Sequence, residues 1–195
     1  MAAPERKQAG IVYAELRNFT RLSEVLEPAK VLQLANDFFT LVAAAVATNG
    51  GAVLAVQNDS IAAAFTGERQ AFARHALTAA QTVQREFGAL GEKWKTDYGL
   101  PAAVALGAHL GEAVFGMAGP LGKQQFVALG DCVSIAERLV HRARTGEIVL
   151  SFDVMKALGP LVQTLGAQEL PALELSNRPP LPIYGMVLET RLDFT

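Results

Sequence analysis

Short apolar runs of strand length alternate with longer segments of helical periodicity along most of this chain, and this alternation constrains its fold most strongly. The clearest helical segment opens at Pro28, where a first-turn proline is tolerated, and ends at residues 49–51, Asn-Gly-Gly. A strand-length run at 10–14 precedes it, and two more, at 52–56 and 60–65, follow it. The pattern predicts an α+β protein.

The second half of the chain continues the alternation. The pattern predicts one sheet with helices on one face. The expected elements are a helix at 19–26, a long helix at 68–98 with a break near 88–91, strands at 102–110 and 112–117 around a turn at Gly111, a strand at 126–129, a helix at 132–143 with Asp131 as its N-cap, a strand at 147–150, a helix at 152–158, and strands at 163–170 and 182–188.

Composition excludes several classes of protein. Apolar residues make up 51% and charged residues 18% of the 195, which is enough to bury a core and argues against disorder. A net charge of -2 disfavours a nucleic-acid binder, and a single cysteine excludes an internal disulfide framework. The N-terminus lacks an export signal, and the longest apolar stretch, at 38–47, is half of what a bilayer span needs. We therefore expect a cytoplasmic protein without membrane contact.

Two carboxylates stand at the ends of predicted strands. Glu15 follows the first strand, and Asp59 lies in the turn between the runs at 52–56 and 60–65. If these strands are neighbours, both side chains reach one edge of the sheet, where they suit Mg²⁺. The chain then turns at once into a helix, whose first backbone N–H groups could bind phosphate oxygens. The alternative is a solvated Glu at a strand end and an Asp that favours the turn.

The remaining polar candidates give weaker signals. The three histidines, His75, His109 and His141, have no mutual ligand spacing, so we expect surface or structural roles for them. Cys132 has no base beside it in sequence and is expected to be a small buried residue. The glycine-rich segment at 116–123 lacks the Gly-Lys-Ser/Thr ending of a phosphate loop, which favours a hairpin loop.

Five ordered blocks resemble the class III adenylate and guanylate cyclases. The blocks are YAELRNFT (13–20), QNDSIAAAF (57–65), GAHLGEA (107–113), FVALGDCVSIAERL (126–139) and GEIVLS (146–151). The resemblance implies a ferredoxin-like cyclase homology domain at 10–188, with short tails at 1–9 and 189–195. It also implies a mostly antiparallel sheet and a homodimer whose active sites lie between subunits.

The resemblance also implies roles for individual residues. It places Glu15 and Asp59 as ligands of Mg²⁺ or Mn²⁺, and Arg138 as the catalytic arginine that stabilises phosphoryl charge. The substrate would be ATP or GTP. Further positions are Ser134 beside the ribose, Ala55 and Gln125 at the base, and the phosphate-binding turn Arg17, Asn18, Phe19 and Thr20.

Several of these positions depart from the family pattern. Glu15 replaces an aspartate, Ala55 a base-reading lysine, Gln125 an aspartate, Ser134 an asparagine and Asn18 a glycine. The first hypothesis is a degenerate cyclase domain that acts as a nucleotide-binding or regulatory module, with a regulatory protein as a candidate partner. The competing hypothesis is an active, divergent cyclase that forms a 3′,5′-cyclic nucleotide and pyrophosphate. A ferredoxin-like RNA binder is a third interpretation, which the charge balance disfavours.

Overall fold

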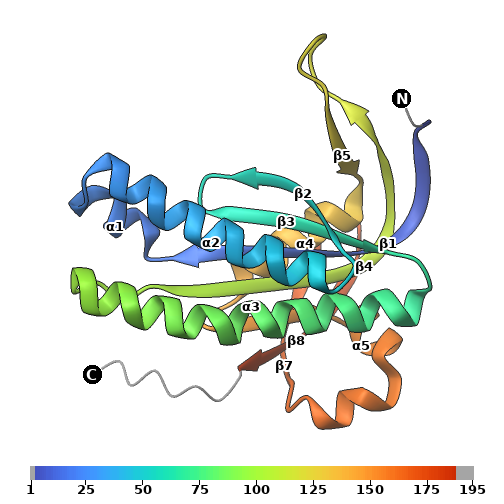
Figure 1. Ribbon diagram of the computed structural model, residues 1–195. Coiled ribbons are helices and arrows are strands. Elements are labelled where there is room, and N and C mark those ends of the chain that lie inside the picture. Colours follow the sequence, from blue (N-terminus) through green and yellow to red (C-terminus); the bar gives the residue numbers. More distant parts are fainter. Residues whose placement is uncertain (1–2, 188–195) are drawn as a thin grey trace.

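An eight-stranded sheet forms the centre of the computed structural model, which describes residues 3–187, and helices cover both of its faces (Figure 1). The strands are β1 (Glu5–Arg17), β2 (Ala52–Gln57), β3 (Ser60–Thr66), β4 (Ala103–Ala118), β5 (Gln125–Leu129), β6 (Glu147–Ser151), β7 (Gln168–Leu175) and β8 (Arg178–Val187). The helices are α1 (Phe19–Val25), α2 (Pro28–Thr48), α3 (Arg69–Tyr98), α4 (Asp131–Arg142) and α5 (Phe152–Leu158), with a 3₁₀ helix at Gly159–Thr164.

The strand order is β2-β3-β1-β4-β6-β8-β7, and β5 pairs with the far end of β4. All pairs are antiparallel except β4 with β6. The predicted α+β, mostly antiparallel sheet is therefore confirmed. β1 is an interior strand between β3 and β4, so the end of β1 is held on both sides.

One face of the sheet is covered by α2, α3 and α5 over a core of large side chains. Phe87 lies between Phe38 and Trp94, with ring centroids 5.9 and 5.5 Å away and both pairs edge-to-face. All three rings are almost fully buried. Aromatic pairs in this arrangement contribute beyond the area that they bury.

The other face is covered by α4, which corrects the prediction that all helices lie on one face. α4 packs very close to β4 at Gly107. A Cβ atom on Gly107 would lie 2.3 Å from the backbone nitrogen of Val140, closer than any real contact. The absence of a side chain at this position therefore lets the helix rest directly on the strand.

Two predicted interruptions are wrong. α3 runs unbroken through Gly91, where a Cβ would come within 2.9 Å of the Ala102 carbonyl oxygen. β4 likewise passes through Gly111 as one strand rather than two. At Gly91 the glycine permits close packing, which local sequence does not distinguish from a chain break.

Other boundaries also shift. β1 begins at Glu5, inside the expected tail at 1–9, and residues 163–167 fall in the 3₁₀ helix and the loop after it rather than in a strand. Asp131 is the first residue of α4 rather than its N-cap, which is Gly130. The expected tail at 189–195 lies outside the described residues.

The helix α2 is long and apolar enough, by length and composition, to cross a membrane. This was not expected, because the uninterrupted apolar stretch in the sequence is shorter. In the fold its buried side, which includes Leu34, Phe38 and Val42, packs into the core. Core helices can be equally long and apolar, so the absence of membrane contact stays a prediction.

Candidate functional site

The two candidate carboxylates lie close together, because β1 pairs with β3 up to Glu15 opposite Ser60, and Asp59 directly precedes Ser60 in the turn. The backbone nitrogen of Leu16 donates to the Asp59 carbonyl oxygen at 2.9 Å. The turn between β2 and β3 consists of Asn58 and Asp59, and Asn58 takes a left-handed conformation with φ of 52°. Asn tolerates this conformation better than most residues, which explains the tight hairpin.

Glu15 is held by two side chains of its own chain. Its side chain is only 12% exposed, and its oxygen Oε1 forms an ion pair with Arg17 Nη1. His141 Nε2 lies 3.3 Å from the other oxygen, Oε2. Glu15 and Arg17 point to the same side of β1 because they are two residues apart, while His141 comes from the last turn of α4.

Arg17 also binds the C-terminal end of α4. Its Nη2 donates to the carbonyl oxygen of Val140 at 2.6 Å and to that of Ala143 at 3.0 Å. These carbonyls belong to a helix end, where backbone acceptors lack partners within the helix and the dipole is negative. Arg17 therefore fixes α4 against the end of β1.

The donor set does not fit two divalent cations. Both oxygens of Glu15 face basic side chains, so neither is free for a metal ion. Among residues 3–187, no group of three or more His, Cys, Asp and Glu side chains could hold a metal. Asp59 is the remaining oxygen donor of the predicted pair, and a single carboxylate holds Mg²⁺ only together with substrate phosphates and waters.

The predicted phosphate-binding turn, residues 17–20, comes at the end of β1 and the start of α1. Asn18 has φ of 65°, and its Nδ2 donates to the Pro101 carbonyl oxygen at 3.3 Å. Phe19 packs against the core, and Thr20 is exposed. The side chain of Asn18 thus anchors this turn to the loop before β4 rather than leaving it open like the expected glycine.

The other predicted positions lie on separate elements. Ser134 and Arg138 are exposed on α4, and the Arg138 guanidinium donates to the Glu174 carbonyl oxygen on β7. Ala55 is exposed on the edge strand β2. Gln125 opens β5, paired with Ala118 on the arm formed by the ends of β4 and β5 (Figure 1). Within one chain, the structure gathers Glu15, Arg17 and Asp59 at one end of the sheet.

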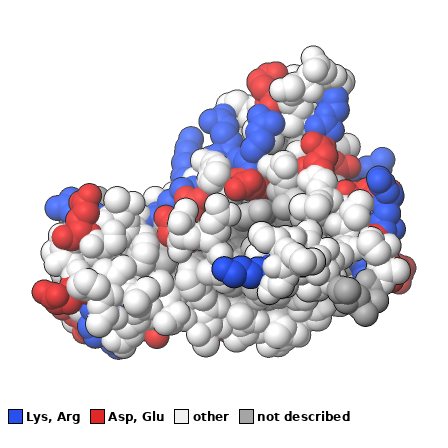
Figure 2. All heavy atoms as spheres, turned by 90° about the horizontal axis from the view of Figure 1, so that it is seen from above, with Lys and Arg blue, Asp and Glu red and all other residues white. Residues whose placement is uncertain are grey.

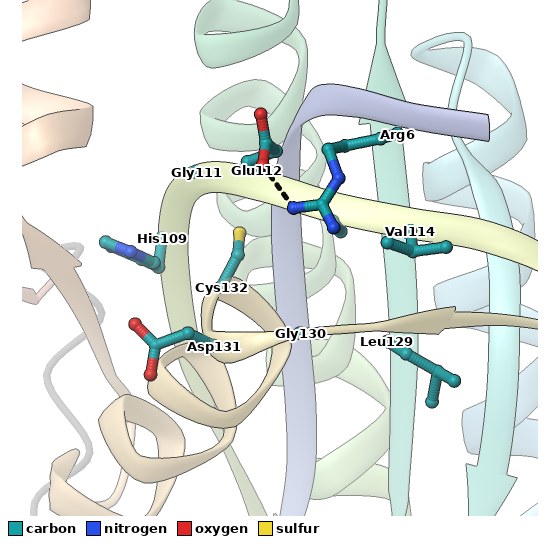
Figure 3. A pocket seen from close by; sticks show the side chains of 10 residues that line it. Arg6, His109, Gly111, Glu112, Val114, Leu129, Gly130, Asp131 and Cys132 are labelled. Atoms are coloured by element: carbon teal, nitrogen blue, oxygen red, sulfur yellow. Dashed lines mark hydrogen bonds and ion pairs between the residues drawn. The ribbon is translucent and has the colours of Figure 1, made fainter.

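A hollow of about 480 Å³ opens beside the N-terminal end of α4, where the sequence predicted no site. His109, Cys132 and Asp131 line it, and the Arg6–Glu112 ion pair at 2.8 Å crosses from β1 to β4 at its rim (Figure 3). His109 Nδ1 lies 2.8 Å from Ser151 Oγ, so the ring is held from the far side.

The hollow offers no activated nucleophile. Burial raises the pKa of the Cys132 thiol to about 12, which keeps it protonated. Burial also lowers the pKa of His109, against the opposing charge of Asp153. The hydrogen bonds from Arg178 at 2.6 and 2.8 Å lower the pKa of Asp131. Asp131 joins α4 to β8 through Arg178, and His109 joins β4 to β6 through Ser151.

Comparison with known proteins defines the class. The profile of the adenylate and guanylate cyclase catalytic domain matches residues 1–179. The chain is 28% identical, over 137 residues, to adenylate cyclase 1 of Rhizobium meliloti (strain 1021); the match covers 69% of this chain and only 20% of that protein. The adenylyl cyclase CyaB from P. aeruginosa has the same fold, with a TM-score of 0.88 and 20% identity over 97% of this chain and 98% of that one. The guanylyl cyclase Cya2 gives 0.83 and 23% over 96% of each.

The fold is therefore that of a class III cyclase domain, as the resemblance implied. The chain belongs to the adenylate and guanylate cyclase catalytic domain family. It spans about a fifth of the length of the Rhizobium relative.

Proposed function

We propose that this chain is a degenerate cyclase domain, with cyclase activity lost or greatly reduced, that works as a dimeric nucleotide-binding or regulatory module. One observation carries this proposal. Ala55, at the position of the base-reading lysine, presents only a methyl group on the exposed strand β2. A methyl group has no donor or acceptor, so this position cannot hold a purine edge.

The position next to the ribose supports the same conclusion. Ser134 is exposed on α4, and its hydroxyl is shorter than the amide of an asparagine. A lost polar contact costs about 1–3 kcal/mol when its partner is left unpaired. Two such losses, if independent, correspond to about 30-fold to about 10⁴-fold in rate, since each 1.4 kcal/mol is about tenfold. The family scaffold is retained better than the contacts that read the substrate.

Exposed apolar side chains support the dimer. The arm of β4 and β5 presents Met117, Phe126 and Leu129, and Leu121 at its tip is 98% exposed. Seen from above, the acidic and basic side chains gather over one part of this side of the molecule, and the rest carries uncharged residues (Figure 2). Exposed apolar side chains grouped on one arm are typical of a protein interface. Sedimentation should therefore show a dimer, and a monomer at every concentration would count against the proposal.

Mg²⁺ or Mn²⁺ would accompany ATP or GTP as the counter-ion of the triphosphate, near Asp59. The competing function, an active cyclase, is favoured by Asp59 and Arg138, which match the family pattern. A regulatory protein remains a candidate partner, because an inactive domain would act through what it contacts.

The deciding experiment is mass spectrometry of products from ATP and GTP with Mg²⁺ or Mn²⁺. We expect no cyclic nucleotide from protein that is folded and dimeric. Cyclic product that disappears in Asp59→Ala would establish the active cyclase instead. The triple change Ala55→Lys, Gln125→Asp and Ser134→Asn should raise activity toward ATP if substrate reading is the main loss. Calorimetry with ATP and GTP then tests nucleotide binding separately from turnover.

A further inference from the structure

The charge of Glu15 is compensated within the chain. We propose that the Arg17 guanidinium takes over the charge-balancing role of a metal ion at Glu15 while His141 occupies the second carboxylate oxygen, so that Glu15 ties β1 to α4 and does not bind a divalent cation. The inference deepens the proposed function and rests on the same site. It concerns the metal stoichiometry of that site, which turnover does not measure.

The first argument is the geometry around the carboxylate. Arg17 Nη1 pairs with Oε1 and His141 Nε2 lies 3.3 Å from Oε2, so each oxygen faces a nitrogen atom of a basic side chain. A divalent cation at either oxygen would lie within a few ångströms of the Arg17 guanidinium. Because Glu15 is buried, water screens this repulsion poorly.

The second argument is that Arg17 is not free to move aside. Its other terminal nitrogen donates to the carbonyl oxygens of Val140 and Ala143. Withdrawing the guanidinium to admit a metal would leave both carbonyls without this donor at a partly buried helix end. The Arg17 guanidinium is thus part of the packing of α4, whereas a metal ion would have to bind from solution.

The third argument is the contrast with Asp59. The two residues lie at neighbouring positions of one sheet edge, yet within residues 3–187 the structure gives the Asp59 carboxylate no ion pair and no hydrogen bond. A general excess of basic residues at this end of the sheet would have paired with both carboxylates. Of the two carboxylates, only Glu15 is paired with basic side chains in the described part of the chain.

Titration with Mn²⁺ alone, followed by the EPR signal of the free ion, tests the inference without nucleotide. Glu15→Gln should change the Mn²⁺ affinity by less than about twofold, because the carboxylate is already paired. Arg17→Gln combined with His141→Gln should tighten Mn²⁺ binding by about tenfold or more, since it frees the carboxylate. Adding Glu15→Gln to that double variant should return the affinity to that of the unmodified protein.

Arg142→Gln is the matched control. It removes a positive charge beside His141 on the same helix, and within the described chain Arg142 has no ion pair with Glu15. It should leave Mn²⁺ binding unchanged. If the double variant fails to fold, as judged by circular dichroism, His141→Gln alone serves, because this side chain is 61% exposed. It should tighten binding in the same direction by a smaller factor.

A loss of Mn²⁺ affinity of about tenfold in Glu15→Gln would overturn the inference, because Glu15 would then be a ligand. Folded variants without Arg17 and His141 that gain no affinity would overturn it as well. Either result can be told apart from failure of the proposed function. Cyclic nucleotide formation would refute degeneracy, while unchanged Mn²⁺ binding in Glu15→Gln would still support the ion-paired role of Glu15.

Discussion

The two faces of the sheet are held together in different ways. On the face of α2, α3 and α5, large rings such as Phe38, Phe87 and Trp94 fill the space between the layers. On the face of α4, the buried side chains are mostly small or aliphatic. There, polar contacts join the elements, among them Arg17 to the end of α4 and Asp131 to Arg178.

The two faces therefore contribute differently: one mainly stabilises the fold, and the other positions the residues of α4. The first face stabilises the fold through buried volume, which depends little on the direction of any one side chain. The second face depends on close backbone approach and on directed polar contacts, so it fixes the position of α4 and of the residues that α4 carries. Substitutions on the two faces should therefore differ in how much they change the free energy of unfolding and in how that change depends on pH.

The largest effect is expected from Phe87→Ala on the aromatic face. The variant loses a fully buried ring and both of its edge-to-face contacts, which should lower the free energy of unfolding by about 3–5 kcal/mol. Urea denaturation measures this. Phe152→Ala is the control, because that ring is 45% exposed and should cost clearly less. Equal losses in the two variants would contradict the proposed contrast.

Gly107→Ala should give the next largest effect, on the α4 face. The added methyl would collide with the backbone of Val140, and overpacking of this kind costs about 1–3 kcal/mol. Gly88→Ala offers a matched comparison, because nothing lies within 4 Å of a Cβ there and alanine suits a helix interior better. Urea denaturation should show opposite signs for the two changes. A neutral Gly107→Ala would mean that α4 does not rest directly on β4.

Acid should destabilise the α4 face through His109. Its pKa is lowered in the fold, mainly by burial, so the unfolded chain binds the proton more readily. The stability that neutral His109 contributes is present above its unfolded pKa, near 6.5, and is lost as the pH falls toward the lower folded value. The slope is at most about 1.4 kcal/mol per pH unit.

Urea midpoints measured between pH 7.5 and 5 should show a weaker pH dependence in His109→Gln than in the unmodified protein. His75→Gln, an exposed histidine on α3, should keep the original dependence. Identical pH profiles in all three proteins would show that His109 does not control the acid response.

The smallest effect is expected for the exposed pair of Asp131 and Arg178. Their side chains are about half exposed, so the pair should contribute about 0–1 kcal/mol despite its two hydrogen bonds. Because Arg178 lowers the pKa of Asp131, this contribution is present at neutral pH and lost as acid protonates the carboxylate. A double-mutant cycle of Asp131→Asn and Arg178→Gln measures it. A coupling well above 1 kcal/mol would place this pair among the main supports of α4.

Periodicity was sufficient to predict most elements of the fold. The repeat of apolar residues predicted the helices at α2 and α3 and the hairpin of β2 and β3, because these features depend on neighbouring residues. The errors at Gly91 and Gly111 have the opposite cause. A glycine that permits tertiary packing looks like a glycine that ends an element, and the difference depends on what lies opposite in space.

The candidate site was predictable only in part. The adjacency of Glu15 and Asp59 was expected only if the first strand lies beside the hairpin, an arrangement that the family resemblance implied and the pairing of β1 with β3 shows. The spacing of Glu15 and Arg17 already indicates one side of a strand. The role of His141 was missed, because it lies 126 residues along the chain from Glu15 and joins it only through the packing of α4. No local pattern signals such a contact, and the histidines were accordingly interpreted as surface or structural residues.

The pairing of β1 with β4 also determines the order in which the chain can assemble during synthesis. β1 finds one neighbour, β3, about fifty residues later, but its other neighbour is far more distant, with Gly10 opposite Leu110. Contacts between such remote segments form slowly, because a long loop must close first. Until β4 leaves the ribosome, one edge of the apolar strand β1 has no partner. A growing chain in this state exposes strand edge to other chains, and a chaperone that shields it would act in this interval.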